Sequence, residues 1–242
     1  MIFNFFTRKP LLKELIPNQF VDIHSHVLPG LDDGAKSTEE SLTLISKMKE
    51  LGFTKIICTP HTYSGIYDNT KKSICNSYNL IKKSFEDIEL KYSSEYMLDQ
   101  TIYKRIEEKS FLCLNKNPIL VELSFIDKPL GLYDMIFKIQ NAGYEIILAH
   151  PERYFFFHNN FNDYEKLKKH GVKFQINLLS CVNYYGKKVT EICDKLFKYD
   201  FVDFVGSDIH NQNHINQFEK KVKITSIKKL KTALENNIYF FG

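Results

Sequence analysis

The chain has 242 residues, of which 43% are hydrophobic and 26% charged, and its formal net charge is +4. This length suits one domain or a tight pair, and the composition excludes a disordered chain, a collagen and a coiled coil. No apolar run approaches the roughly 18 residues of a membrane span, and the small net charge gives no indication of nucleic-acid binding.

The first 19 residues are expected to form an N-terminal arm before a single domain at 20–242. Phe3, Phe5 and Phe6 suggest either a membrane or partner contact or packing on the domain, and we favour packing. The arm lacks the order of basic and apolar residues of a signal peptide. The cysteines form no Cys-x-x-Cys pair and are expected to be reduced, so we expect a cytoplasmic protein; they are Cys58, Cys75, Cys113, Cys181 and Cys193.

Seven apolar, β-type runs alternate with helical periods along the chain. They cover residues 20–24, 55–59, 89–93, 119–123, 145–149, 173–178 and 201–206. Between the first two, Ser37 and Glu40 form a capping box before a helix that ends at Gly52. Apolar residues within 189–197 recur at helical spacing, which predicts a second, amphipathic helix. The alternation predicts a parallel α/β fold, a seven-stranded barrel, with an open doubly wound sheet as the alternative.

Metal-ligand side chains collect where these runs end. The residues concerned are His24, His26, His61, Glu95, Glu122, His150, Asp208 and His210, with Asp33 in an early turn. If the strands are parallel, these side chains meet at the end of the barrel where active sites are built. His24 and His26 point to the same face, as do Asp208 and His210.

Imidazoles combined with carboxylates suit Zn, Mn or Fe, and nine ligands are about right for three ions. Each residue also has an ordinary interpretation. A single His-x-His is often only polar, Glu122 could be an edge-strand charge, and we expect Asp32 only to shape a turn. The coincidence of so many ligand types at strand ends favours a metal centre.

Other hydrolytic chemistries lack their residues here. No cysteine is followed by arginine at the spacing of Cys-x5-Arg phosphatases, and there is no Gly-x-Ser-x-Gly elbow or P-loop. Hydrolysis would therefore be metal-assisted: clustered cations would bind phosphate oxygens and lower the pKa of a metal-bridging water, which attacks phosphorus.

Several motifs carry a resemblance to a known family. They are His24-Ser25-His26 with Asp32-Asp33-Gly34, Thr59-Pro60-His61, the Glu95 segment, His150-Pro151-Glu152-Arg153 and Ser207-Asp208-Ile209-His210. Together they resemble the PHP superfamily, and within it the bacterial CpsB/CapC-type protein-tyrosine phosphatases of capsule and exopolysaccharide systems. The resemblance covers residues 20–211.

The resemblance implies a distorted (β/α)7 barrel with three divalent ions, usually manganese, although iron or zinc would also suit the ligands. It implies that the first ion is held by His24, His26, Glu95 and Asp208. The second would be held by Glu95, Glu122 and His150, and the third by Asp33, His61 and His210.

The resemblance also implies that Arg153 contacts the substrate phosphate. A second family arginine has no counterpart in residues 211–217, where His214 is a candidate replacement. The implied substrate is phosphotyrosine on a bacterial tyrosine autokinase, typically on its flexible tail.

Three alternatives stay open at this point. One is a small-molecule phosphatase of the same superfamily, acting on a compound such as histidinol phosphate. Another is a phosphodiesterase, against which the small net charge argues. The last is a non-catalytic binding protein in which the metals are structural.

Overall fold

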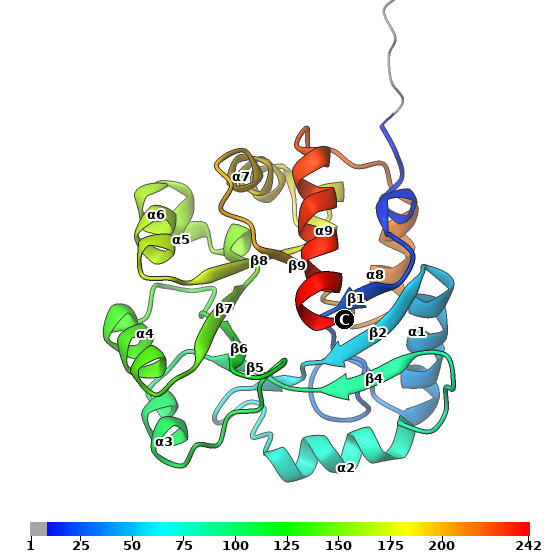
Figure 1. The fold of residues 1–242 in the computed structure, drawn as a ribbon, viewed down its shortest axis with the longest axis horizontal. Helices are drawn as coiled ribbons and strands as arrows, with labels where there is room; N and C mark the ends of the chain where they lie inside the picture. The colour runs from blue at the N-terminus through cyan, green and yellow to red at the C-terminus, as the bar shows by residue number, and fades with distance from the viewer. Residues whose placement is uncertain (1–8) are drawn as a thin grey trace, which may run out of the picture.

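The computed structural model describes residues 9–242, and its parallel strands are surrounded by helices (Figure 1). The α/β class expected from the alternating pattern is confirmed. Phe3, Phe5 and Phe6 lie outside the described residues. The following part of the arm packs on the domain, because Leu12 and Leu15 are buried and the Leu12 N–H donates to the Lys220 carbonyl at 2.9 Å.

The strands form two parallel sheets. The first has the order β1-β2-β4, and the second has the order β3-β5-β6-β7-β8-β9. The strands are β1 (Phe20–Asp22), β2 (Phe53–Cys58), β3 (His61–Thr62), β4 (Glu89–Tyr92), β5 (Glu95–Met97), β6 (Pro118–Glu122), β7 (Glu145–Ala149), β8 (Lys173–Asn177) and β9 (Phe204–Gly206).

Every expected run overlaps a strand, but the hydrogen-bonded ladder is less continuous than the sequence suggests. After β2 the chain passes Thr59 and Pro60 and resumes as β3; after β4 it resumes as β5. Pro60 has no N–H to donate, so the ladder is interrupted there, although its carbonyl still accepts from the Glu95 N–H at 3.1 Å. These two short strands were not expected as separate elements, and the last strand is shorter than the run at 201–206.

The first and last strands lie side by side without a regular ladder. Ser25 and Ile209 form an isolated parallel bridge, and the Asp208 N–H donates to the His24 carbonyl at 2.8 Å. The Asn237 side chain spans the gap, with its Nδ2 donating to the carbonyls of Val21 at 2.9 Å and Val205 at 2.7 Å. Along β1 and β9 side-chain hydrogen bonds therefore take the place of the backbone bonds of a regular barrel, and backbone bonds join the two segments beyond the strand ends.

Nine helices are present in the described part of the chain. They are α1 (Thr38–Glu50), α2 (Lys71–Ile81), α3 (Thr101–Glu107), α4 (Leu132–Asn141), α5 (Phe155–His158), α6 (Asn162–Lys169), α7 (Lys187–Lys198), α8 (Gln212–Asn216) and α9 (Ile227–Phe241). Four short 3-10 turns accompany them at Leu12–Leu15, Pro151–Arg153, Leu178–Val182 and Gln217–Glu219. Within residues 9–242, no helix combines the length and apolar character needed to cross a bilayer.

Both helices expected from the sequence are present. Ser37 caps α1 by accepting from the Glu40 N–H, but the Glu40 carboxylate reaches the Lys36 N–H instead of that of Ser37. Of the two hydrogen bonds expected in the capping box, the one from the Glu40 N–H to Ser37 is confirmed and the reciprocal one to the Glu40 side chain is wrong. Gly52 follows the helix with a φ of +98°, as a left-handed stop requires. In α7 the apolar face is buried over its whole expected length.

Candidate metal centre

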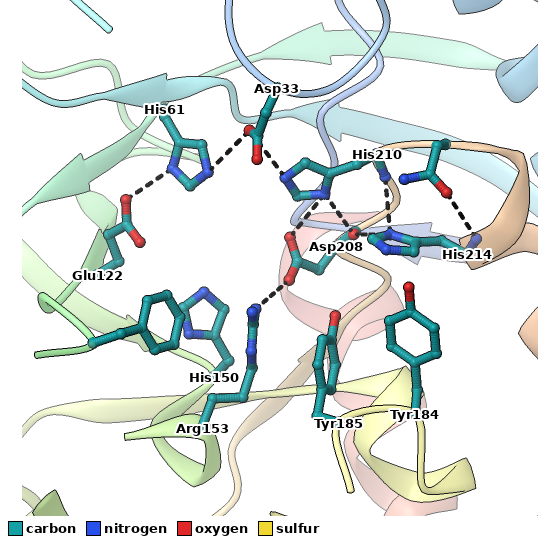
Figure 2. A pocket seen from close by; sticks show the side chains of 12 residues that line it. Asp33, His61, Glu122, His150, Arg153, Tyr184, Tyr185, Asp208, His210 and His214 are labelled. Carbon is teal, nitrogen blue, oxygen red and sulfur yellow. Dashed lines mark hydrogen bonds and ion pairs between the residues drawn. The ribbon is translucent and has the colours of Figure 1, made fainter. Parts of the chain in front are cut away.

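A pocket of about 300 Å³ opens where the strands end. Figure 2 shows imidazoles and carboxylates converging from several strands on its floor, with Arg153 and two tyrosines on one side. The nine ligand candidates all belong to clusters whose ligand atoms lie within 4.8 Å of one another. The fold therefore brings together every candidate that the sequence pattern identified.

His24 and His26 face each other at the centre of this cluster. Their Nε2 atoms are 3.1 Å apart. Each Nδ1 lies 2.7 Å from an acceptor, Oε1 of Gln175 for His24 and Oδ2 of Asp32 for His26, which places a proton on Nδ1. In the neutral rings the two Nε2 lone pairs then point at one another. Such an arrangement is repulsive unless a proton or a metal ion lies between the two nitrogens, and it fits a metal ion.

Two carboxylates complete this group. Glu95 Oε2 lies 3.1 Å from His24 Nε2 and 3.4 Å from His26 Nε2, while Asp208 Oδ1 lies 3.3 and 3.4 Å from the same atoms. Ligands about 2.1 Å from one ion and at right angles to each other are about 3.0 Å apart. These four residues are the set expected for the first ion, and their spacing suits one.

The second expected set is only partly assembled. His150 Nε2 lies 3.1 Å from Glu95 Oε1, so these two residues face each other as expected. Glu122 instead lies beside His61, whose Nδ1 is 2.8 Å from Glu122 Oε1 and 3.1 Å from Glu95 Oε2. Glu95 thus contacts both histidines, as a bridging carboxylate does.

The third expected set is assembled around Asp33. Its Oδ1 lies 3.4 Å from His210 Nε2 and 3.6 Å from His61 Nε2. The His26 ring stacks on that of His210 with a centroid distance of 3.9 Å and belongs to the same cluster. His61 therefore turns one nitrogen toward each of two groups, which suggests that the groups lie side by side (Figure 2).

Several buried polar atoms in the cluster have no hydrogen-bond partner among the described residues. Glu95 Oε1 and His61 Nδ1 are examples, although each lies within 3.2 Å of another ligand candidate. Buried polar atoms are rarely left unpaired in proteins. Short contacts without hydrogen-bond geometry are what ligands of a shared ion show, so the residues fit divalent metal ions.

The electrostatic balance favours bound cations. Burial alone would raise the pKa of Glu95, but His24 and His61 lower it well below its ordinary value. Burial lowers the pKa of His24, yet Glu95 and Asp208 raise it above the usual range. The field that would hold a proton on this imidazole also attracts a metal ion. By contrast, burial and then Arg153 lower the pKa of His150 to about 4, which keeps the ring neutral and able to ligate.

Local backbone geometry fixes the ligands. His150 and Asp208 have φ values of +34° and +52°, a region that non-glycine residues seldom occupy and that often marks functional sites. At the end of β9, a Cβ on Gly206 would lie 2.6 Å from His24 Cβ and 2.7 Å from Gln175 Nε2. Only glycine leaves room for these two side chains.

Arg153 lies on the wall of the pocket, as expected for a phosphate ligand. Its Nη1 donates to Asp208 Oδ2 at 2.8 Å, and its guanidinium lies over the rings of Phe125 at 4.8 Å and Tyr185 at 4.2 Å. His214 also lines the pocket, but its Nδ1 faces backbone atoms, with the Asp208 carbonyl at 3.0 Å. Only the opposite edge of its ring remains for a substrate.

Sequence reasoning missed residues that support these ligands. Asp32 is buried and does more than shape a turn: it accepts from His26 Nδ1 and from the N–H groups of Gly34 and His61. Gln175 holds His24 in the same way. Asn177 Nδ2 donates to Asp208 Oδ2 at 2.7 Å and to the Tyr185 hydroxyl at 2.9 Å. The only signal in the sequence for Gln175 and Asn177 was the alternation of polar and apolar residues along β8.

Comparison with known proteins gives consistent results. The family described as "Capsular polysaccharide synthesis, CpsB/CapC" matches residues 20–240. Tyrosine-protein phosphatase YwqE of Bacillus subtilis (strain 168) is 29% identical over 196 residues, covering 79% of this chain and 77% of that protein. Tyrosine-protein phosphatase CpsB of Streptococcus pneumoniae is 28% identical over 202 residues, covering 79% and 83% of the two chains.

A solved structure has a similar fold. It comes from work on YwqE of Bacillus subtilis and CpsB of Streptococcus pneumoniae, described as unique metal-dependent tyrosine phosphatases. It superposes with a TM-score of 0.73 at 24% identity and covers 92% of this chain and 88% of its own. The arrangement of strands and helices is therefore shared with these proteins.

Proposed function

Because the chain belongs to the CpsB/CapC family of capsular polysaccharide synthesis, we propose that it is a metal-dependent protein-tyrosine phosphatase. The observation that carries this proposal is the pair of Nε2 atoms of His24 and His26, 3.1 Å apart with both Nδ1 atoms already engaged. The relatives named as tyrosine-protein phosphatases support the reaction.

Three divalent ions, manganese in the first instance, would occupy the centre. His24, His26, Glu95 and Asp208 would hold one ion, with His150 beside Glu95 at a second. Asp33, His61 and His210 would hold a third. Glu122 would be a further metal ligand, beside His61 and Glu95. When bound, such ions supply Lewis-acid polarisation of phosphate oxygens and a bridging water with a lowered pKa.

The protein's own residues bind and orient the phosphoryl group. Arg153 is held by Asp208 and by the rings of Phe125 and Tyr185, so its guanidinium is positioned before substrate arrives. It offers a planar, permanently charged fork for phosphate oxygens. His214 is a weaker second contact, through the ring edge that turns away from the backbone.

The pocket suits an aryl phosphate. Phe125, Tyr184 and Tyr185 give it aromatic sides above a polar floor, and a phenolate leaves readily without a strong general acid. We propose that residues 20–242 act as one domain in the cytoplasm on phosphotyrosine of a protein, such as the tail of a bacterial tyrosine kinase. The capsule-synthesis family supports this setting.

The test is an assay of the purified chain with Mn²⁺. Phosphotyrosine peptide, histidinol phosphate and a phosphodiester are offered separately, with and without chelator. We expect chelator-sensitive release of phosphate from the peptide, and little from the other two. Replacing all five cysteines with serine should leave this turnover intact in a protein that still folds, since the mechanism uses no thiol. Peptide hydrolysis that survives chelation, or turnover of the phosphodiester instead, would refute the proposal.

A further inference from the structure

A second hollow adjoins the metal pocket on the side of the loops that follow β3 and β6. It shares His61, Glu122 and Phe125 with that pocket, so the two hollows lie next to each other. Its remaining surface is mainly apolar and comes from Tyr63, Ile66, Tyr67, Met97, Ser124 and Ile126. We call the surface formed by Tyr63, Ile66, Tyr67, Phe125 and Ile126 the apolar shelf.

The apolar shelf exposes more hydrophobic surface than single scattered residues would. Ile126 is 93% exposed, Ile66 59% and Phe125 45%. Contiguous exposed apolar side chains beside a polar site commonly mark a binding surface. The exposed side chains of the shelf can therefore contact a polypeptide bound at the metal pocket.

Both loops that carry the shelf are held in place by the metal-centre residues. Tyr63 and Tyr67 exchange backbone hydrogen bonds at 3.0 and 2.8 Å, and the Tyr67 ring stacks on that of His61 at a centroid distance of 5.6 Å. Phe125 stacks on His150 at 5.5 Å and lies under Arg153. The shelf is therefore built on side chains that would ligate metal or bind phosphate.

We propose that the apolar shelf binds an apolar side chain next to the phosphotyrosine of the substrate polypeptide, and so determines which phosphotyrosines are hydrolysed. This inference rests on the proposed function. The phosphotyrosine ring itself is accommodated by the aromatic sides of the metal pocket. An extended peptide advances about 3.5 Å per residue, so neighbouring side chains reach the adjoining hollow.

The test compares two phosphotyrosine peptides that differ only in the two residues on each side of the phosphotyrosine, leucine in one and serine in the other. The Mn²⁺-loaded wild-type chain should show a kcat/KM about tenfold higher for the leucine peptide, as burial of one aliphatic side chain implies. Ile126→Ser should lose most of this preference, mainly through a higher KM.

Leu130→Ser is the matched control. Leu130 is 90% exposed in the same loop but does not line the shelf, so this variant should keep the wild-type preference. p-Nitrophenyl phosphate, which has no neighbouring residues, reports on the metal centre alone.

Three results would overturn the inference. One is a wild-type chain that hydrolyses both peptides equally well. Another is an Ile126→Ser variant that loses as much activity on p-nitrophenyl phosphate as on the leucine peptide, because the shelf would then hold the aryl ring. The third is an equal loss of preference in Leu130→Ser. A wild-type chain inactive on every substrate would instead refute the proposed function, and this inference with it.

Discussion

At the scale of single residues, Arg153 is the only arginine among residues 9–242 that lines the metal pocket. We expect Arg153→Ala to lower kcat/KM on a phosphotyrosine peptide by about 10²-fold, because a preorganised charge-assisted contact to the phosphate is lost. Arg153→Lys should recover little, since a point charge does not replace the planar fork. The measurement is steady-state kinetics with metal content determined for each variant.

His214→Ala separates the two candidates for phosphate binding. Because His214 turns its Nδ1 to the backbone, we expect a smaller loss than for Arg153→Ala. An equal loss would show that the imidazole has taken the place of the family's second arginine. A metal-replete Arg153→Ala that keeps activity within a few-fold would show that this arginine serves only its ion pair with Asp208.

Asp32 gives a second residue-scale prediction. In each of its observed hydrogen bonds, Asp32 accepts from an N–H group of His26, Gly34 or His61. In Asp32→Asn, the new amide NH₂ would face one of these N–H donors, and that hydrogen bond would be lost. Losing such support for a ligating histidine typically weakens metal affinity by about 10- to 100-fold. Titration of the metal-free variant with Mn²⁺ measures this change, and excess Mn²⁺ should restore most activity.

Asp127→Asn is the control for Asp32→Asn, because Asp127 is exposed and outside the centre. An Asp32→Asn variant that binds Mn²⁺ as tightly as the wild type would restrict Asp32 to shaping its turn, the role expected from the sequence.

At the scale of elements, α9 joins β1 to β9 through one buried side chain. Asn237→Ala leaves the carbonyls of Val21 and Val205 and the Val205 N–H without their partner. We expect the free energy of unfolding to fall by about 3 kcal/mol, since unpaired buried backbone groups are costly. Urea denaturation measures it, with the exposed Glu235→Ala on the same helix as control. Equal midpoints for both variants would contradict this role.

At the scale of the whole molecule, the metal centre draws its ligands from strands spread along the chain. Ions that bind only the folded state stabilise it by mass action. With Mn²⁺ at about 1,000 times its dissociation constant, chelation should lower Tm by roughly 10 °C. Thermal denaturation with and without chelator measures this, and His24→Ala should show a smaller shift. A Tm that does not respond to chelator would argue against structural coupling of the ions.

The sequence alone determined the α/β class, both marked helices and the identity of the nine ligand candidates. Strand periodicity and the placement of polar residues after apolar runs are local properties, and parallel strands necessarily bring their carboxyl ends to one side. For that reason residues as distant in the chain as His24 and Asp208 could be assigned to one site before any coordinates.

Other features depended on tertiary structure. The pairing of Glu122 with His61 and the support from Asp32, Gln175 and Asn237 arise from contacts between distant segments. A hydrogen bond depends on distance and angle between two particular atoms, and no spacing rule in one strand specifies which side chain another strand will present. Sequence periodicity therefore predicted which residues share the site, while tertiary packing determined which of their atoms form contacts.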